Sequence, residues 1–106
     1  MPIPEAFCPQ FHQAAELVGR RWTGAVIRAL LYDHVCRFSD LLQTIPGISA
    51  RMLSERLKEL ESEGVLRKSQ AGYQLTAKGR ALIPVVEALT TWAEEWIPKP
   101  RKRRSA

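Results

Sequence analysis

The sequence lacks the features that would place the chain in a membrane or outside the cell. Only two of its 106 residues are cysteines, Cys8 and Cys36, too few for the disulfide framework of a small secreted domain. No apolar run approaches the roughly 18 residues of a membrane span. Residues 1–5 show neither the basic start nor the apolar stretch of a secretory signal. We therefore expect a cytoplasmic protein with reduced thiols, although a single disulfide between the two cysteines stays open.

The sequence also lacks the motifs of common enzymes and cofactor sites. It contains no Gly-x-Ser-x-Gly, no His-Glu-x-x-His and no glycine-rich phosphate loop after a strand. The segment Gly19–Gly24 has a glycine at each end, but it follows a predicted helix instead of a strand. Cys8, His12, His34 and Cys36 do not form the close pairs typical of a metal site. The sequence predicts a protein without enzymatic activity, metal or cofactor, and Cys36 is interpreted as structural.

Positive charge is concentrated at one end of the chain. The formal net charge is +5, and residues 1–98 carry as many basic as acidic side chains, so the whole excess lies in residues 99–106. A basic appendage on a neutral body suits a polyanionic partner, although a solvated tail that only aids solubility has the same composition. We expect one domain over residues 1–98 and a basic, disordered tail over residues 99–106.

Helical periodicity and turn signals predict a mainly α protein with one small β-hairpin. Pro46 and Gly47 interrupt the helical pattern, Ser49 can cap the helix that follows, and Gly64 can end it. The predicted helices are 9–18, 22–31, 39–44, 50–62 and 77–96, and the predicted strands are 65–69 and 73–76, joined by 70–72.

Finer features of these elements are also predicted. Ser39 and Asp40 are expected to cap the third helix, and a short strand is expected near Phe38. Thr76 is expected to cap the last helix, which Pro84 should bend because proline breaks the helical hydrogen-bond pattern. Two short helices joined by a Pro-Gly turn and followed by a hairpin form a winged helix-turn-helix.

The helix at 50–62 has the two faces that a DNA-reading helix needs. On a helical wheel Leu53, Leu57 and Leu60 fall within about 40° of one another. Arg51, Glu55, Lys58 and Ser62 cluster on the opposite side, with Ser54 on the flank. One face can therefore anchor in a core while the other enters the major groove. An ordinary amphipathic surface helix has the same pattern, because charged pairs four residues apart are routine.

The sequence resembles the HxlR-type winged-helix regulators over about residues 7–97. The matching segments are Cys8-Pro9, Leu17-Val18-Gly19-Arg20-Arg21-Trp22-Thr23, Arg37-Phe38-Ser39-Asp40-Leu41, Pro46-Gly47-Ile48-Ser49-Ala50-Arg51-Met52-Leu53, Leu57-Lys58-Glu59-Leu60-Glu61, Gly64-Val65-Leu66, Leu75-Thr76-Ala77-Lys78-Gly79-Arg80 and Leu82-Ile83-Pro84-Val85. The resemblance implies a bacterial transcriptional regulator, with repression favoured over activation. It also implies a homodimer that joins through its N- and C-terminal helices and binds an inverted-repeat operator in double-stranded DNA at the nucleoid.

The residues expected to contact DNA come from three places. The third helix contributes its start, the helix at 50–62 its exposed N-terminal half, and the hairpin its cations. These residues are Arg37, Ser39, Ser49, Ala50, Arg51, Ser54, Glu55, Lys58, Arg67 and Lys68. Arginine can read guanine through two hydrogen bonds, and glutamate can accept from cytosine. Lysine, serine and the free amides at a helix N-terminus can hold phosphate.

Large apolar residues near both ends of the chain suggest the dimer interface. They are Phe7, Phe11, Leu89, Trp92 and Trp96, more than one small core obviously needs. The alternative is that they cover the core of their own chain.

One feature of the sequence departs from the family resemblance, and a second, Cys8, shares it. Family wings are usually longer, whereas only about three residues separate the strands here, so minor-groove contact by the wing tip is in doubt and the basic tail is expected to supply backbone contacts. Several HxlR-type regulators also resemble redox or electrophile sensors that use a cysteine in the N-terminal Cys-Pro position. A thiol at the N-terminus of a helix is more readily deprotonated and so more reactive, and His12 could face it.

Three interpretations of the function therefore stay open. The first is a sequence-specific regulator in which Cys8 is a small packing residue, and the second is the same regulator with Cys8 as the sensor of an oxidant or small-molecule effector. The third is a winged-helix module that docks a protein, with the tail binding nucleic acid weakly. No membrane partner is expected.

Overall fold

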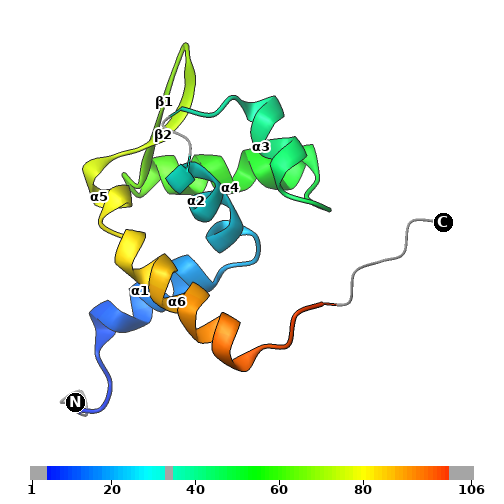
Figure 1. The fold of residues 1–106 in the computed structure, drawn as a ribbon. Coiled ribbons are helices and arrows are strands. Elements are labelled where there is room, and N and C mark those ends of the chain that lie inside the picture. Colours follow the sequence, from blue (N-terminus) through cyan, green and yellow to red (C-terminus); the bar gives the residue numbers. More distant parts are fainter. Residues whose placement is uncertain (1–4, 33–34, 101–106) are drawn as a thin grey trace.

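The computed structural model describes residues 5–32 and 35–100 and has the predicted order of elements (Figure 1). His34 and the last six residues of the predicted tail lie outside the described residues. The elements are α1 (Pro9–Gly19), α2 (Thr23–Tyr32), α3 (Phe38–Thr44), α4 (Ala50–Ser62), β1 (Leu66–Ser69), β2 (Gly72–Leu75), α5 (Ala77–Arg80) and α6 (Ile83–Trp96). The prediction of a mainly helical winged helix-turn-helix is confirmed.

Helix α4 begins and ends where the sequence predicts. The Ser49 hydroxyl oxygen accepts a hydrogen bond from the Met52 amide at 3.0 Å and so satisfies one of the free donors at the helix N-terminus. Gly64 follows the last turn with φ +75°, a left-handed conformation that glycine adopts without strain. Leu53, Leu57 and Leu60 are buried. These three leucines anchor α4 in the core.

The segment before α3 differs from the prediction. Phe38 begins the helix and Arg37 occupies the N-cap position that Ser39 and Asp40 were expected to fill. Asp40 instead lies in the first turn, where its carboxylate accepts from the Arg37 amide at 3.4 Å. The strand expected near Phe38 is also wrong: the extended pairing occurs at Cys36, whose amide and carbonyl exchange hydrogen bonds with Tyr73.

The hairpin is tighter than predicted. Strand β1 pairs antiparallel with β2, and Ser69 lies opposite Gly72, so only Gln70 and Ala71 separate the strands. Gly72 has φ +136°, and a Cβ atom added there would lie 2.5 Å from the Cys36 carbonyl oxygen. Glycine is therefore required where the connector before α3 crosses the hairpin.

The predicted long last helix is two helices. Thr76 caps the short α5, as its side chain accepts from the Gly79 amide at 3.2 Å, and α6 then starts anew at Ile83. Pro84 lies in the first turn of α6, where its missing amide hydrogen leaves no helical hydrogen bond unmade. The predicted bend at Pro84 is wrong because the chain breaks before the proline.

The core lies between α2, α3, α4 and the hairpin. Its buried side chains include Val26, Ile27, Leu41, Leu53, Leu57, Leu60, Val65 and Leu66. Trp22 packs against this core from just before α2 with φ +75°, which is why the helix starts at Thr23, one residue later than predicted. Helices α1 and α6 lie at the end of the molecule away from the hairpin tip (Figure 1). None of the helices in the described part of the chain has the length and apolarity that a membrane crossing requires.

Candidate nucleic-acid interface

The face of α4 opposite its leucines is open to solvent. The Arg51 side chain is 90% exposed, and its Nε lies 3.4 Å from Glu55 Oε1. Glu55 and Lys58 are exposed and Ser54 is half-buried. An ion pair this exposed is weak, so a base edge or a phosphate can displace Glu55 from Arg51 at little cost.

A shallow groove brings together predicted residues from three elements. Arg37 at the start of α3, Ser54 on α4 and Lys68 on β1 all line this groove, which has a volume of about 510 Å³. The Lys68 ammonium lies 5.7 Å from the centre of the Tyr73 ring, a cation–π contact that keeps it beside the groove. Two cations and a hydroxyl therefore converge next to the exposed face of α4.

The other predicted contact residues lie around this groove or on the wing. Ser39, Ser49 and Ala50 are exposed at the starts of α3 and α4. The Ser49 oxygen already accepts from Met52, but its hydroxyl hydrogen stays available for a phosphate. Arg67 is exposed on β1 opposite Gln74.

Arg56 is a basic residue of α4 that cannot take part in the open face. Its side chain is only 12% exposed. Its Nε donates to the Arg21 carbonyl oxygen at 2.8 Å, and its Nη1 donates to both Glu59 carboxylate oxygens at 2.9 Å. The sequence could have indicated this role, because Arg56 lies three residues after Leu53 and four before Leu60, a spacing that places it on the core side of the helix.

Arg20 completes a network that joins α4 to the corner between α1 and α2. Its Nη1 lies 3.0 Å from Glu59 Oε2. Partial burial raises the pKa of Glu59, but the hydrogen bonds and charges of Arg20 and Arg56 outweigh this effect and hold the pKa below its usual value. The Glu59 carboxylate therefore stays ionised between two guanidinium groups.

Helices α1 and α6 expose large apolar side chains. Helix α1, every residue of which is described, buries no side chain fully, and α6 buries only Val86. Phe11 is 72% exposed, Trp92 57% and Trp96 67%, and Phe7 and Leu89 are also about half exposed. Exposed aromatic side chains in such number are typical of an interaction surface.

Cys8 is an exposed thiol at the start of α1. It occupies the N-cap position, where its sulfur accepts from the Phe11 amide at 3.4 Å. His12 contacts the Phe7 ring at a centroid distance of 5.4 Å and lies 3.7 Å from the Glu16 carboxylate. Cys36 is buried, and both cysteines are free thiols, so the disulfide left open by the sequence does not form within the chain.

Comparison with known proteins identifies the class. The model of the HxlR-like helix-turn-helix family matches residues 17–101. The chain belongs to the HxlR-like helix-turn-helix family. It is 40% identical over 97 residues to the uncharacterized HTH-type transcriptional regulator YvaP of Bacillus subtilis, which covers 85% of this chain and 89% of the relative.

Solved structures agree with this HxlR-like assignment. Quinone-bound YodB from B. subtilis superimposes with a TM-score of 0.77 at 41% identity, covering 85% of this chain and all of YodB. The redox regulator HypR in its reduced form superimposes with a TM-score of 0.74 at 29% identity, covering 81% of this chain and 91% of HypR. This HxlR-like protein is therefore a transcriptional regulator with a winged-helix fold.

Proposed function

We propose that the protein is a homodimeric repressor that binds an inverted-repeat operator through α4. The observation that supports this most strongly is the division of α4: three buried leucines fix one side, while Arg51 and Lys58 are exposed on the other. A helix held in this way can enter the major groove without unfolding any of the core. Its site of action would be the chromosomal DNA.

The contact residues divide into those that read bases and those that hold the backbone. Arg51, near the N-terminus of α4, is suited to pair with guanine, with Ser54 and Glu55 beside it for neighbouring bases. Lys58, Ser49 and the amide of Ala50 are suited to phosphate. Arg37, Ser39, Arg67 and Lys68 extend the phosphate contacts on either side of the groove.

The exposed apolar residues of α1 and α6 are proposed as the dimer interface. Phe7, Phe11, Leu89, Trp92 and Trp96 would be covered by the same residues of a second copy, as in a two-fold symmetric interface. Two copies of α4 would then face half-sites about one helical turn apart, roughly 34–36 Å.

Selection of binding sequences from a random duplex pool tests this proposal. We expect an inverted-repeat consensus. The Arg51→Ala variant should lose about 1–3 kcal/mol of binding free energy on that consensus and should discriminate less between sequences. Lys68→Ala, the matched control on the wing, should weaken all sequences about equally. Recovery of no consensus at physiological salt would overturn the proposal and favour a protein-docking module.

Cys8 is proposed as the sensor of an electrophile or oxidant. Its sulfur is exposed, and the relatives that resemble this chain include a quinone-bound YodB and HypR in reduced and oxidised forms. With a quinone, the Cys8 sulfur would form a bond to a ring carbon, while the thiol proton ends on one quinone oxygen and the hydrogen of that ring carbon moves to the other. The product is a hydroquinone thioether on α1.

The thiol proposal is tested by operator affinity after treatment with a benzoquinone. The wild type should lose affinity and Cys8→Ser should keep it. Cys36→Ser serves as the control, since its buried thiol is expected to leave the response unchanged. If wild type and Cys8→Ser respond equally, Cys8 is not the sensor.

The basic tail is proposed to supply backbone contacts that the short wing cannot make. The prediction rests on its five cations, most of which lie outside the described residues. Deletion of residues 99–106 should flatten the dependence of log affinity on log salt concentration, because fewer counterions are released on binding. An unchanged slope would contradict this role.

A further inference from the structure

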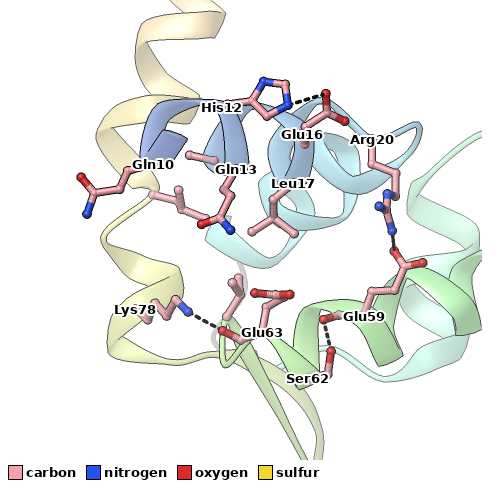
Figure 2. A pocket seen from close by; sticks show the side chains of 13 residues that line it. Gln10, His12, Gln13, Glu16, Leu17, Arg20, Glu59, Ser62, Glu63 and Lys78 are labelled. Carbon is pink, nitrogen blue, oxygen red and sulfur yellow. Dashed lines mark hydrogen bonds and ion pairs between the residues drawn. The ribbon is translucent and has the colours of Figure 1, made fainter. Parts of the chain in front are cut away.

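A cavity between α1 and the C-terminal end of α4 has no part in the interface described above. Its volume is about 580 Å³, within the range of small-molecule sites in proteins. Leu17 of α1 and Leu82 before α6 line it with half-buried apolar side chains, and Val65, which is almost fully buried, lies behind them. Figure 2 shows α1 forming one wall and the end of α4 with Lys78 forming the opposite wall.

The two strongly basic side chains at this cavity already have oxygen partners. Lys78 Nζ donates to the Glu63 carbonyl oxygen at 2.6 Å, and Arg20 lies 3.0 Å from the Glu59 carboxylate. Both contacts are drawn in Figure 2. Neither cation is therefore available for an anionic ligand without breaking a contact that holds the fold together.

The acidic side chains at the cavity are less well paired. Among the described residues the Glu63 carboxylate has no ion-pair or hydrogen-bond partner, and Glu16 has only His12, at 3.7 Å. With neutral histidine, the lining residues Glu16, Glu59, Glu63, Arg20 and Lys78 carry a formal charge of −1. The cavity is therefore slightly acidic within a domain, residues 1–98, whose formal charge is zero.

Several acidic residues lie at the C-terminal end of α4. The C-terminus of a helix carries a partial negative charge, which disfavours carboxylates and favours cations. Helix α4 nevertheless has Glu59, Glu61 and Glu63 in and just after its last turn, with no basic residue there. Lys78 at the Glu63 carbonyl oxygen, and Arg20 and Arg56 at Glu59, offset part of this conflict, which leaves the Glu63 carboxylate as the charge that a bound cation would offset.

We propose that this cavity binds a small amphipathic amine, with its ammonium group at the Glu63 carboxylate and its apolar body against Leu17 and Leu82. The Gln13 amide, which extends from α1 toward the opposite wall in Figure 2, supplies a carbonyl acceptor on that side. Because the Arg20–Glu59 pair forms one end of the cavity, an occupant touches both α1 and α4. Binding of the amine is therefore expected to change the affinity of α4 for the operator, a consequence that rests on the proposed function.

Titration calorimetry with 2-phenylethylamine tests the site without DNA. The neutral 2-phenylethanol and the anionic 3-phenylpropionate, which share the aromatic body, should bind at least about tenfold more weakly, as expected for the loss of one charged hydrogen bond. Glu63→Gln should weaken the amine about tenfold. Glu61→Gln is the control, because Glu61 lies two residues before Glu63 and does not line the cavity. It should leave amine binding unchanged. Equal binding of amine and alcohol, or equal behaviour of the two variants, would overturn the proposal.

A second measurement separates the site from its regulatory effect. Operator affinity is measured with and without saturating 2-phenylethylamine, in wild type and in Glu63→Gln. A shift in wild type that is absent in Glu63→Gln supports the regulatory role. A bound amine with unchanged operator affinity overturns that role. Failure of the protein to bind any operator would overturn the proposed function instead, while the calorimetry still decides whether the site exists.

Discussion

The two ends of the molecule differ in how completely they are folded. The body, made of α2, α3, α4 and the hairpin, closes its own core, and its leucines on α4 are buried. The apolar end, made of α1 and α6, buries almost nothing and exposes phenylalanine and tryptophan side chains. One chain is therefore enough to complete the body, whereas the apolar end exposes the surface that the proposed dimer would cover. The contrast separates residues that stabilise the fold from residues that we propose to build the assembly.

The largest expected effect tests the body. Leu57→Ala removes a fully buried side chain and should lower the free energy of unfolding by about 2–5 kcal/mol, because the cavity left behind adds to the lost burial. Urea unfolding measures this. Val35→Ala, at an exposed apolar position, should change stability by less than about 0.5 kcal/mol. Similar effects of the two variants would show that Leu57 is not part of a packed core.

The next effect tests the apolar end. Trp92→Ala should weaken self-association by about 2–4 kcal/mol, as expected for an aromatic residue at the centre of an interface. Sedimentation over a range of protein concentrations measures this, and the helical circular dichroism of the monomer should stay unchanged. Glu94→Ala on the same helix is the control. If Trp92→Ala unfolds the monomer and leaves association unchanged, the aromatic residues cover their own core.

A smaller effect tests the contact between the two regions. Arg56→Lys should cost about 1–2 kcal/mol of stability, because lysine cannot donate at once to the Arg21 carbonyl and to both Glu59 oxygens. The reverse exchange on the exposed face, Lys58→Arg, is the control and should leave the stability unchanged. Thermal unfolding of both variants decides the matter, and equal melting temperatures would show that the network adds nothing.

The smallest effect concerns pH. The pKa of Glu59 is lowered in the folded protein, so its ion pairs stabilise the fold above the unfolded value of about 4.3. This stabilisation is lost as the pH falls further, through the folded pKa. Glu59→Gln should therefore be less stable than wild type at pH 7, by less than about 1 kcal/mol because the carboxylate is partly exposed. The difference should shrink as the pH falls through the folded pKa of Glu59; a constant difference would contradict the assignment.

The sequence predicts the body better than the details around it. The leucine spacing, Ser49 and Gly64 are local signals, and α4 has the bounds that they predict. The split between α5 and α6 was missed because a proline inside an apolar helical pattern is compatible with either a bend or a new helix. The cap of α3 was missed because Asp40 can act from the cap position or from the first turn. Local sequence does not distinguish these alternatives.

The candidate interface could be predicted in its parts but not in its arrangement. The helical wheel identified Arg51 and Lys58 as outward-facing, and both are exposed. That Arg37, Ser54 and Lys68 share one groove depends on the packing of the hairpin against α3 and α4, which no local pattern specifies. The role of Arg56 depends on the Arg21 carbonyl, 35 positions away along the chain.

In the proposed dimer, the two-residue connection between β1 and β2 would limit how much DNA sequence one subunit can recognise. With strands of only four residues each, the tip of the hairpin extends little beyond the groove beside α4. If α4 is the only element that touches base edges, each half-site has few specified positions. Discrimination between genomic sites must then depend on the distance and orientation of two such half-sites. A change in the spacing of the half-sites should therefore weaken binding as much as a change in their base sequence.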